Sequence, residues 1–404
     1  MNLEPRVTLF VAATVALVGC GDPDPRSDWI TRHDTAASGT VHVTHFPPAN
    51  ISPTWDLTEE LRVGSLEGAG PDAFAFLKGL VAFDGGGFAV LDSEYREVRV
   101  FDPDGGHVAT HGRRGQGPGE FVNPNGLMLD SLGRLWVPDP RGARMSVFDP
   151  EDGFIEAFHF ATLYSGWAWN GRMVGGGRIH RPDQDRAWVR VYDLTMTLAD
   201  SLPLFADHPD EEDYDPEDPP DAFYQEFDDG SFMYRAIPYR AYGPSFIDSR
   251  GAVWSARAGD PQYRIVRVEP GGDTTLVIET RRPAVRVPEA ERDSVIGDFR
   301  QMLADRGVSR QWDWSRIPTV KPAVESIFES PEGNLWVRTP STDGSVLYDV
   351  YSEQGDHQGT AALAPGIAPS AEIGLVVKGD VVWFVVTDEF DVHHVVRTRM
   401  TPAG

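Results

Sequence analysis

The segment Gly115-Gln-Gly-Pro-Gly-Glu-Phe121 decides the fold, because a related copy, Gly68-Ala-Gly-Pro-Asp-Ala-Phe74, stands 47 residues before it. Both copies follow the pattern G-x-G-P-x-x-F. Glycine permits positive φ, proline fixes φ near about −65°, and the phenylalanine after the turn can fill the space between neighbouring sheets. The same offset aligns Val100-Phe-Asp-Pro103 with Val147-Phe-Asp-Pro150. An ungapped repeat of this length indicates stacked supersecondary units.

Each repeat contains four short runs of β-type residues separated by hairpin-turn residues. In the second copy the runs are Gly126-Leu-Met-Leu129, Arg134-Leu-Trp-Val137, Arg144-Met-Ser-Val-Phe148 and Phe154-Ile-Glu-Ala-Phe158. This pattern predicts a four-stranded antiparallel meander, which is the blade of a β-propeller. Pieces of the repeat recur around Trp254, Trp336 and Trp383, so repeats are expected to start near residues 75, 122, 163, 241, 322 and 371.

The chain also suggests how such a ring would close. The last repeat has three candidate strands, at residues 372–377, 381–387 and 393–399, while residues 55–64 precede the first turn. Pairing this N-terminal strand with the last blade would remove two open sheet edges. We therefore predict an all-β fold, a six-bladed β-propeller whose N-terminal strand completes the last blade, with one inserted helix. The alternative, two stacked β-sandwiches, does not explain the constant offset.

Residues 112–149 resemble one full NHL repeat, from the glycine-rich turn through Asp139 and Arg144 to Asp149. Residues 68–102 keep the turn and the final strand, so the resemblance is carried by about 90 residues. It implies a β-propeller architecture more than any one activity. In NHL-like repeats the arginine at the position of Arg144 commonly supports neighbouring turns, which implies a structural role for it here.

The N-terminal residues predict export. Residues 7–19 are almost entirely apolar but too few to span about 30 Å of hydrocarbon, so residues 1–19 are expected to be a signal peptide. Leu17-Val-Gly-Cys20 resembles the lipobox of bacterial lipoproteins, which implies a lipid on Cys20, and Gly21 implies the outer membrane. An ordinary secretory signal is the alternative. Residues 20–52, rich in Asp, Pro, Ser and Thr, are predicted to be a flexible tether before the propeller of residues 53–404.

The amino-acid composition excludes some classes of binding partner. The formal net charge is −26, so phosphate-rich partners would be repelled and nucleic acid is not expected. Cys20 is the only cysteine, which excludes an internal disulfide. We expect a monomer attached to a membrane through the lipid.

Two insertions interrupt the repeats, at residues 207–239 and 286–318. Residues 207–229 hold twelve carboxylates and no Lys or Arg, without the glycine and terminal glutamate of an EF-hand loop, so a mobile acidic loop is predicted. Residues 288–306 predict an amphipathic helix lying over one face of the ring, with a lid or a partner-docking helix as alternatives. Its apolar positions are Val295, Ile296, Phe299, Met302 and Leu303.

Aromatic and arginine residues alternate directly after the acidic stretch. Tyr234, Arg235, Tyr239 and Arg240 are therefore candidates for a binding rim, because rigid rings and planar guanidinium groups suit recognition surfaces. A strand whose arginines extend over apolar surface is the structural alternative. Asp139 and Arg141 are further candidates, in a loop expected at one mouth of the channel.

The predicted function is a membrane-anchored binding or scaffolding protein that holds a protein, peptide or glycan through loops at one channel mouth. Neither H-E-x-x-H nor G-x-S-x-G occurs, and no catalytic residue is identified. No cofactor is predicted. The alternative is a metal-dependent hydrolase or lyase of the lactonase kind with an axial Ca or Zn ion, whose ligands would come singly from several blades.

Overall fold

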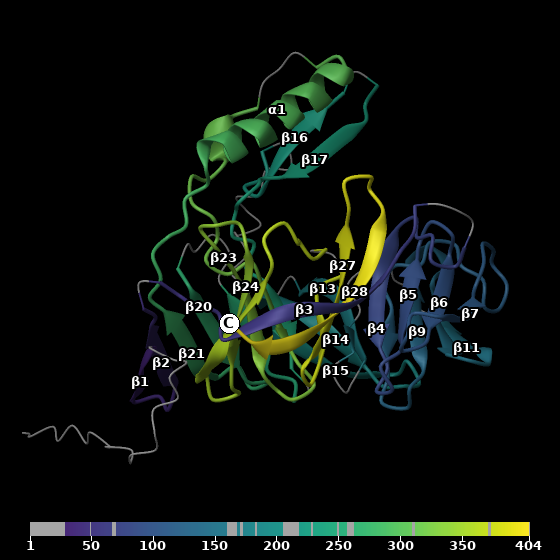
Figure 1. The fold of residues 1–404 in the computed structure, drawn as a ribbon, viewed down its shortest axis with the longest axis horizontal. Coiled ribbons are helices and arrows are strands. Elements are labelled where there is room, and N and C mark those ends of the chain that lie inside the picture. Colours follow the sequence, from purple (N-terminus) through teal and green to yellow (C-terminus); the bar gives the residue numbers. More distant parts are fainter. Residues whose placement is uncertain are drawn as a thin grey trace, which may run out of the picture.

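The computed structural model describes residues 29–48, 50–66, 70–159, 168–169, 173–181, 184–204, 218–227, 229–248, 250–256, 262–308, 312–370 and 373–403. The mostly-β fold predicted from the repeat is confirmed. Sheets of four to eight strands, mostly antiparallel, form the body of the molecule, and a helix with a β-hairpin projects from it (Figure 1).

The first three sets of four strands follow one another along the chain, each strand paired with the next. The first set contains β4 (Leu77–Ala82), β5 (Phe88–Asp92), β6 (Glu97–Phe101) and β7 (His107–His111). The second contains β8 (Met128–Leu129), β9 (Leu135–Asp139), β10 (Arg144–Asp149) and β11 (Gly153–His159). The third contains β12 (Ala168–Trp169), β13 (Met173–Arg181), β14 (Gln184–Tyr192) and β15 (Leu198–Leu204). The meander predicted for residues 126–158 is confirmed by the second set.

Two more sets follow the first insertion and flank the second. One contains β18 (Ser245–Ile247), β19 (Val253–Ala256), β20 (Arg264–Val268) and β21 (Thr274–Thr280). The other contains β22 (Ser326–Glu329), β23 (Leu335–Pro340), β24 (Val346–Tyr351) and β25 (His357–Leu363). Apolar side chains from both sets, including Trp254, Ile278 and Leu335, share one buried cluster. The two sheets therefore pack face to face.

The chain's two ends meet in one sheet. β26 (Val376–Lys378), β27 (Val381–Thr387) and β28 (His393–Pro402) are joined by β3 (Trp55–Val63), which runs antiparallel to β28 from Val395↔Val63 to Pro402↔Trp55. The predicted pairing of the N-terminal strand with the C-terminal sheet is confirmed. β3 also contacts β25 through a short parallel pairing at Ala361↔Trp55, so it links two neighbouring sheets.

A buried carboxylate and an arginine hold each copy of the glycine-rich turn. The Asp139 carboxylate accepts hydrogen bonds from the backbone N–H groups of Val122 and Asn123, and the Arg144 guanidinium donates to carbonyls of the turn. In the first copy, Asp92 and Arg99 make the same kinds of contact with residues 71–76. This is the structural role that the NHL resemblance implied for Arg144.

The phenylalanine of the turn fills the space between sheets, as its place in the repeat predicted. Phe121 is fully buried in a cluster with side chains of both adjoining sheets, including Val98 and Leu135. Gly112, at φ 87°, lies directly against the Phe121 ring, where a Cβ would collide with it. The turn therefore needs both glycine's positive φ and its missing side chain.

The tether predicted for residues 20–52 is wrong within its described part. β1 (Ile30–Thr35) and β2 (Val41–Phe46) form a hairpin, and β2 adds parallel to β21 from Val41↔Leu276 to His45↔Thr280. Alternation explains the error: Val43 and His45 face inward and are fully buried, while polar neighbours face out. The polar residues concealed a short strand that gains its stability from an existing sheet edge.

The helix spans the residues predicted for it, but it does not pack against the part of the molecule that was predicted. α1 (Glu289–Asp305) begins after Pro288 and packs on a hairpin of β16 (Ala222–Glu226) and β17 (Phe232–Ala236), not over a face of the body. Within 207–239, which was predicted to be an acidic loop, the described part therefore contains a hairpin; residues 207–217 lie outside the described residues. We call α1, β16, β17 and the short helix η3 (Trp314–Arg316) the projecting unit.

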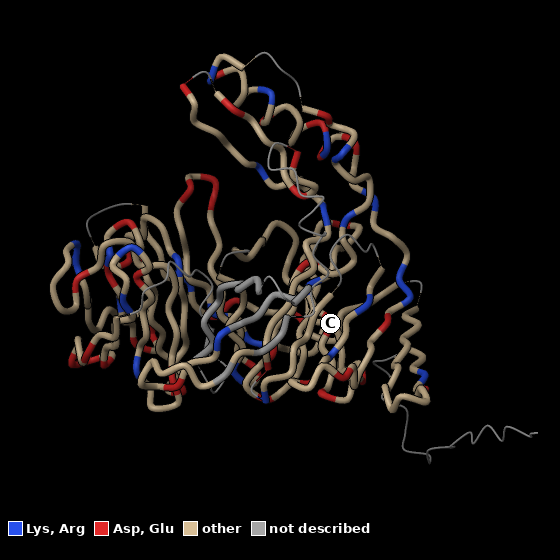
Figure 2. The backbone as a smooth tube through the Cα atoms, turned by 180° about the vertical axis from the view of Figure 1, so that it is seen from behind, with Lys and Arg blue, Asp and Glu red and all other residues tan. Residues whose placement is uncertain are grey.

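The projecting unit has its own apolar core. Phe223 and Met233 from the hairpin meet Ile296 and Leu303 from the helix, and all four are buried. Phe223 stacks on Trp312 with ring centroids 4.8 Å apart. The two insertions thus bury each other's apolar faces. Lys and Arg residues follow one another along the connection to the body (Figure 2).

Replacing Leu57 tests the sheet that joins the two ends. Leu57 lies on β3 and is buried among Trp336, Phe384 and Val396. Leu57→Ala should lower the free energy of unfolding by about 2–5 kcal/mol, measured by urea titration with tryptophan fluorescence. The matched control is Leu66→Ala, because Leu66 is 64% exposed and should change stability by no more than about 0.5 kcal/mol. Equal effects of the two substitutions would show that β3 is not part of the core.

Candidate functional site

Three aromatic rings lie together on the outer face of the projecting hairpin. The register places Tyr224 opposite Tyr234 and Glu226 opposite Phe232. Ring centroids are 5.1 Å apart for Tyr224 and Tyr234, 5.6 Å for Phe232 and Tyr234, and 6.4 Å for Tyr224 and Phe232. Phe232 is 64% exposed and Tyr234 is 39% exposed. We call these three residues the aromatic cluster.

Strand alternation produces this arrangement. Phe223 and Met233 point toward α1, so the neighbouring residues Tyr224, Phe232 and Tyr234 point away from it. The helix, the stacked Phe223–Trp312 pair and the hairpin register together fix the backbone beneath the cluster. The rings are therefore presented on a rigid support.

The four residues predicted to form a binding rim, Tyr234, Arg235, Tyr239 and Arg240, lie in two different parts of the projecting unit. Tyr234 belongs to the aromatic cluster, and the exposed Arg235 follows it at the end of β17. Tyr239, at φ 61°, instead lies near Glu291 at the start of α1, with the Lys321 Nζ atom 5.9 Å from the centre of its ring. Burial and this carboxylate raise the pKa of Tyr239 to about 12. Arg240 is half-buried beside it, with its backbone N–H donating to Ile237, so these two residues belong to the base of the unit.

The other two candidates lie in the body, away from the aromatic cluster. Asp139 is fully buried and accepts backbone hydrogen bonds from three residues, the third being Gly142. It therefore holds a turn, and its carboxylate is not exposed to solvent. Arg141 is exposed in the short helix η1 (Pro140–Gly142), which Asp139 caps. Cys20 lies outside the described residues.

Sequence reasoning missed Tyr224 and Phe232. Phe232 stands two residues before Tyr234, and that spacing alone places the two side chains on one face of a strand. Tyr224 could not be assigned, because its pairing depends on the register between two strands joined by a turn at residues 227–231.

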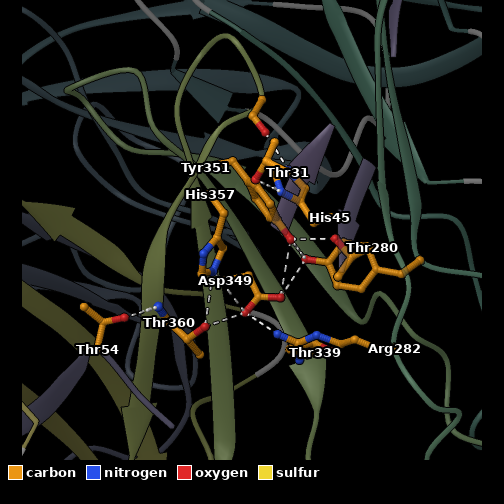
Figure 3. A network of polar contacts seen from close by, with 12 residues as sticks. Thr31, His45, Thr54, Thr280, Arg282, Thr339, Asp349, Tyr351, His357 and Thr360 are labelled. Carbon is orange, nitrogen blue, oxygen red and sulfur yellow. Dashed lines mark hydrogen bonds and ion pairs between the residues drawn. The ribbon is translucent and has the colours of Figure 1, made fainter. Parts of the chain in front are cut away.

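A second group of polar side chains is buried between the sheets of β18–β21 and β22–β25 (Figure 3). Its centre is Asp349, whose carboxylate accepts hydrogen bonds from Tyr263, Thr360 and the guanidinium of Arg282. Tyr351 donates to the Tyr263 hydroxyl at 3.0 Å and contacts the Thr280 hydroxyl at 2.9 Å. Burial raises the pKa of both tyrosines, so their hydroxyls stay neutral.

The N-terminal hairpin covers this buried group. Trp29 stacks on the His357 imidazole with ring centroids 3.6 Å apart, and the His45 Nε2 atom lies 2.8 Å from the Gly355 carbonyl oxygen. Burial lowers the pKa of His357 to about 4 and also lowers that of His45. The Asp349 oxygens already accept several hydrogen bonds and Trp29 lies over His357, so this carboxylate and this imidazole join strands and are not open to a ligand.

Among the residues that the structure describes, no group of three or more His, Cys, Asp or Glu side chains is placed to hold a metal ion. No helix in that part of the chain is long and apolar enough to cross a membrane. An axial Ca or Zn ion stays an untested alternative.

Comparisons with known proteins complete these findings. No family model matches the chain, and no curated protein matches it. A member of the DUF4221 family from Bacteroides vulgatus is 8% identical, with 87% of this chain and 99% of that chain covered and a TM-score of 0.46. Virginiamycin B lyase from Staphylococcus aureus is 14% identical, with 80% and 94% covered and a TM-score of 0.39. At these values the likeness assigns no function to this chain.

The buried histidine predicts how stability depends on pH. The neutral form of His357 is favoured in the folded chain, so its contribution is present above the ordinary pKa of 6.5 and is lost as the pH falls toward about 4. Between pH 7 and pH 4, the free energy of unfolding should fall by about 3 kcal/mol from this residue. His357→Gln should reduce that slope in urea titrations, whereas His107→Gln, at an exposed position, should leave it unchanged. Identical slopes for wild type and His357→Gln would contradict the assignment.

Proposed function

We propose that this chain is an exported, lipid-anchored binding protein in which a six-bladed β-propeller presents the aromatic cluster to a polypeptide partner. The six blades are the sets of β4–β7, β8–β11, β12–β15, β18–β21 and β22–β25, with β26–β28 and β3 as the last. The resemblance of residues 68–149 to NHL repeats supports the ring, as does the pairing of β3 with β28.

The aromatic cluster is the observation that carries this proposal. Large apolar rings are normally buried, and isolated exposed ones need no explanation, but three in mutual contact on one rigid face resemble the anchors of protein interfaces. Tyr and Phe give large contact area for little loss of side-chain freedom on binding. A partner that covers these rings would remove apolar surface from water.

The hairpin's geometry favours a polypeptide. In the described part of the chain, β16 and β17 pair only with each other, so their outer edges retain backbone groups that can accept a further strand. An extended peptide could pair with such an edge and place alternate side chains against the aromatic face. The aromatic cluster thus lies beside strand edges that can pair with a peptide backbone, and a glycan has no such backbone.

Replacing Phe232 tests the proposed surface. A photoreactive phenylalanine analogue at position 232 should cross-link a defined polypeptide in intact cells, and that polypeptide, once purified, should bind the wild-type chain. Phe232→Ser should weaken this binding at least about tenfold, since truncated interface anchors commonly cost 2 kcal/mol or more. Surface plasmon resonance would measure the change.

Phe390→Ser is the matched control, because Phe390 is also 64% exposed but lies between β27 and β28. It should leave the affinity unchanged. Equal cross-linking from positions 232 and 390 would count against the proposal, as would equal loss of affinity in the two variants. Material that is cross-linked at position 232 and destroyed by periodate but not by protease would identify a glycan instead.

The proposed anchor is tested separately. Cys20→Ser should move the protein from the membrane fraction to the soluble fraction of the cell envelope, because the lipid attachment atom is removed. Immunoblots of both fractions, with metabolic labelling by a palmitate analogue, would measure it. Unchanged membrane association together with absent labelling in the wild type would refute lipidation and leave the aromatic cluster's role untouched.

A further inference from the structure

A cavity of about 300 Å³ lies where the projecting unit joins the body. Two of the described chain segments at this junction pair with each other: the Val287 N–H donates to the Thr319 carbonyl at 3.0 Å, and the Lys321 N–H donates to the Val285 carbonyl at 2.8 Å. Arg282, Lys321 and Thr339 line the cavity. Its size is at the lower end of the range for sites of small organic ligands.

Arg282 forms a fixed, partly unsatisfied wall of this cavity. Its guanidinium is paired with Asp349, lies 5.3 Å from the Trp29 ring and 5.8 Å from the Tyr263 ring, and is 90% buried. The Nε atom is buried and has no hydrogen-bond partner within the described part of the chain. A buried N–H without an acceptor costs free energy. Because the Nε atom is closed off from solvent, a ligand would reach Arg282 through the part of its side chain that lines the cavity.

The lining of the cavity contains more cations than carboxylates, unlike the chain as a whole. Lys and Arg total 36 in the chain against 62 Asp and Glu, yet the lining contains Arg281, Arg282 and Lys321 against the single carboxylate Glu279. Arg281 is paired with Glu279, and Lys321 with Glu291, so these cations are already held in place. Arg282 is likewise paired with Asp349, so a ligand carboxylate would share these cations with their carboxylate partners and would need little rearrangement of their side chains.

Gln262, Tyr263 and Thr280 also line the cavity, and the other lining residues are apolar and favour a ligand with an apolar part. These apolar residues are Pro283, Ala284, Val285, Ala323 and Pro340. We propose that this cavity binds a small organic carboxylate with an apolar body, whose oxygens are held by Arg282 and Lys321 and by the Thr339 hydroxyl. This site is distinct from the aromatic cluster and does not depend on the function proposed for it.

Benzoate is a suitable probe, and benzamide is its uncharged analogue. Titration calorimetry on the mature full-length chain should show one benzoate site, with benzamide and inorganic phosphate binding at least about tenfold more weakly, since hydrogen bonds to charged groups contribute about 1.5–3 kcal/mol. Lys321→Gln should weaken benzoate binding by a similar factor, and Thr339→Val by a smaller one. Both variants would be checked for folding by circular dichroism.

Lys378→Gln provides the matched control. Lys378 is 28% exposed and paired with Asp84, much as Lys321 is 21% exposed and paired with Glu291, but it lies on β26. Benzoate affinity should be unchanged in this variant. The proposal is overturned if benzoate does not bind, if benzamide or phosphate binds as tightly, if Lys378→Gln weakens binding as much as Lys321→Gln, or if both cavity variants fold and bind as the wild type does.

Discussion

The contact between a buried carboxylate and the turn that precedes its sheet is the interaction on which the body depends. Asp139 accepts hydrogen bonds from the N–H groups of Val122 and Asn123. Arg144 donates hydrogen bonds to carbonyl oxygens of the same turn. A turn buried between two sheets would otherwise leave these polar groups without partners, at a cost of about 1–3 kcal/mol each. Asp92 repeats the carboxylate contact 47 residues before Asp139, so that spacing reflects a physical requirement, and Arg99 makes the matching carbonyl contacts from a position 45 residues before Arg144.

A second arrangement, a hydrogen bond from a tryptophan indole to an aspartate, recurs at hairpins within the sheets. Asp130 accepts a hydrogen bond from the Trp136 indole at 2.9 Å, and Asp248 accepts one from Trp254 at 3.1 Å. In each case the carboxylate also accepts backbone N–H groups of the tight turn that separates it from the tryptophan. A large ring can therefore be buried without leaving its N–H unpaired. Ser330 occupies the corresponding place before Trp336, which shows how the pattern weakens along the chain.

Much of this organisation could be predicted because it is local. The second meander, the range of the helix and the role of Arg144 depend on residues within one repeat or one helix, and the β3–β28 pairing follows from sheet edges that need partners. The docking of β2 on β21 and of α1 on β16–β17 depends on faces more than 50 residues apart. Asp139 was placed at a channel mouth because a loop position gives no measure of burial. The Tyr224–Tyr234 contact needed a register that sequence does not specify.

The docked N-terminal hairpin also sets a geometric limit. Only nine peptide steps separate Cys20 from Trp29, whose ring is held against His357. A fully extended chain of that length reaches roughly 30 Å. With a lipid on Cys20, the edge of the sheet that contains β21 would be kept within that distance of the bilayer, and the rotational freedom of the whole molecule would be restricted. The short hairpin would then act as a spacer that orients the protein on its membrane.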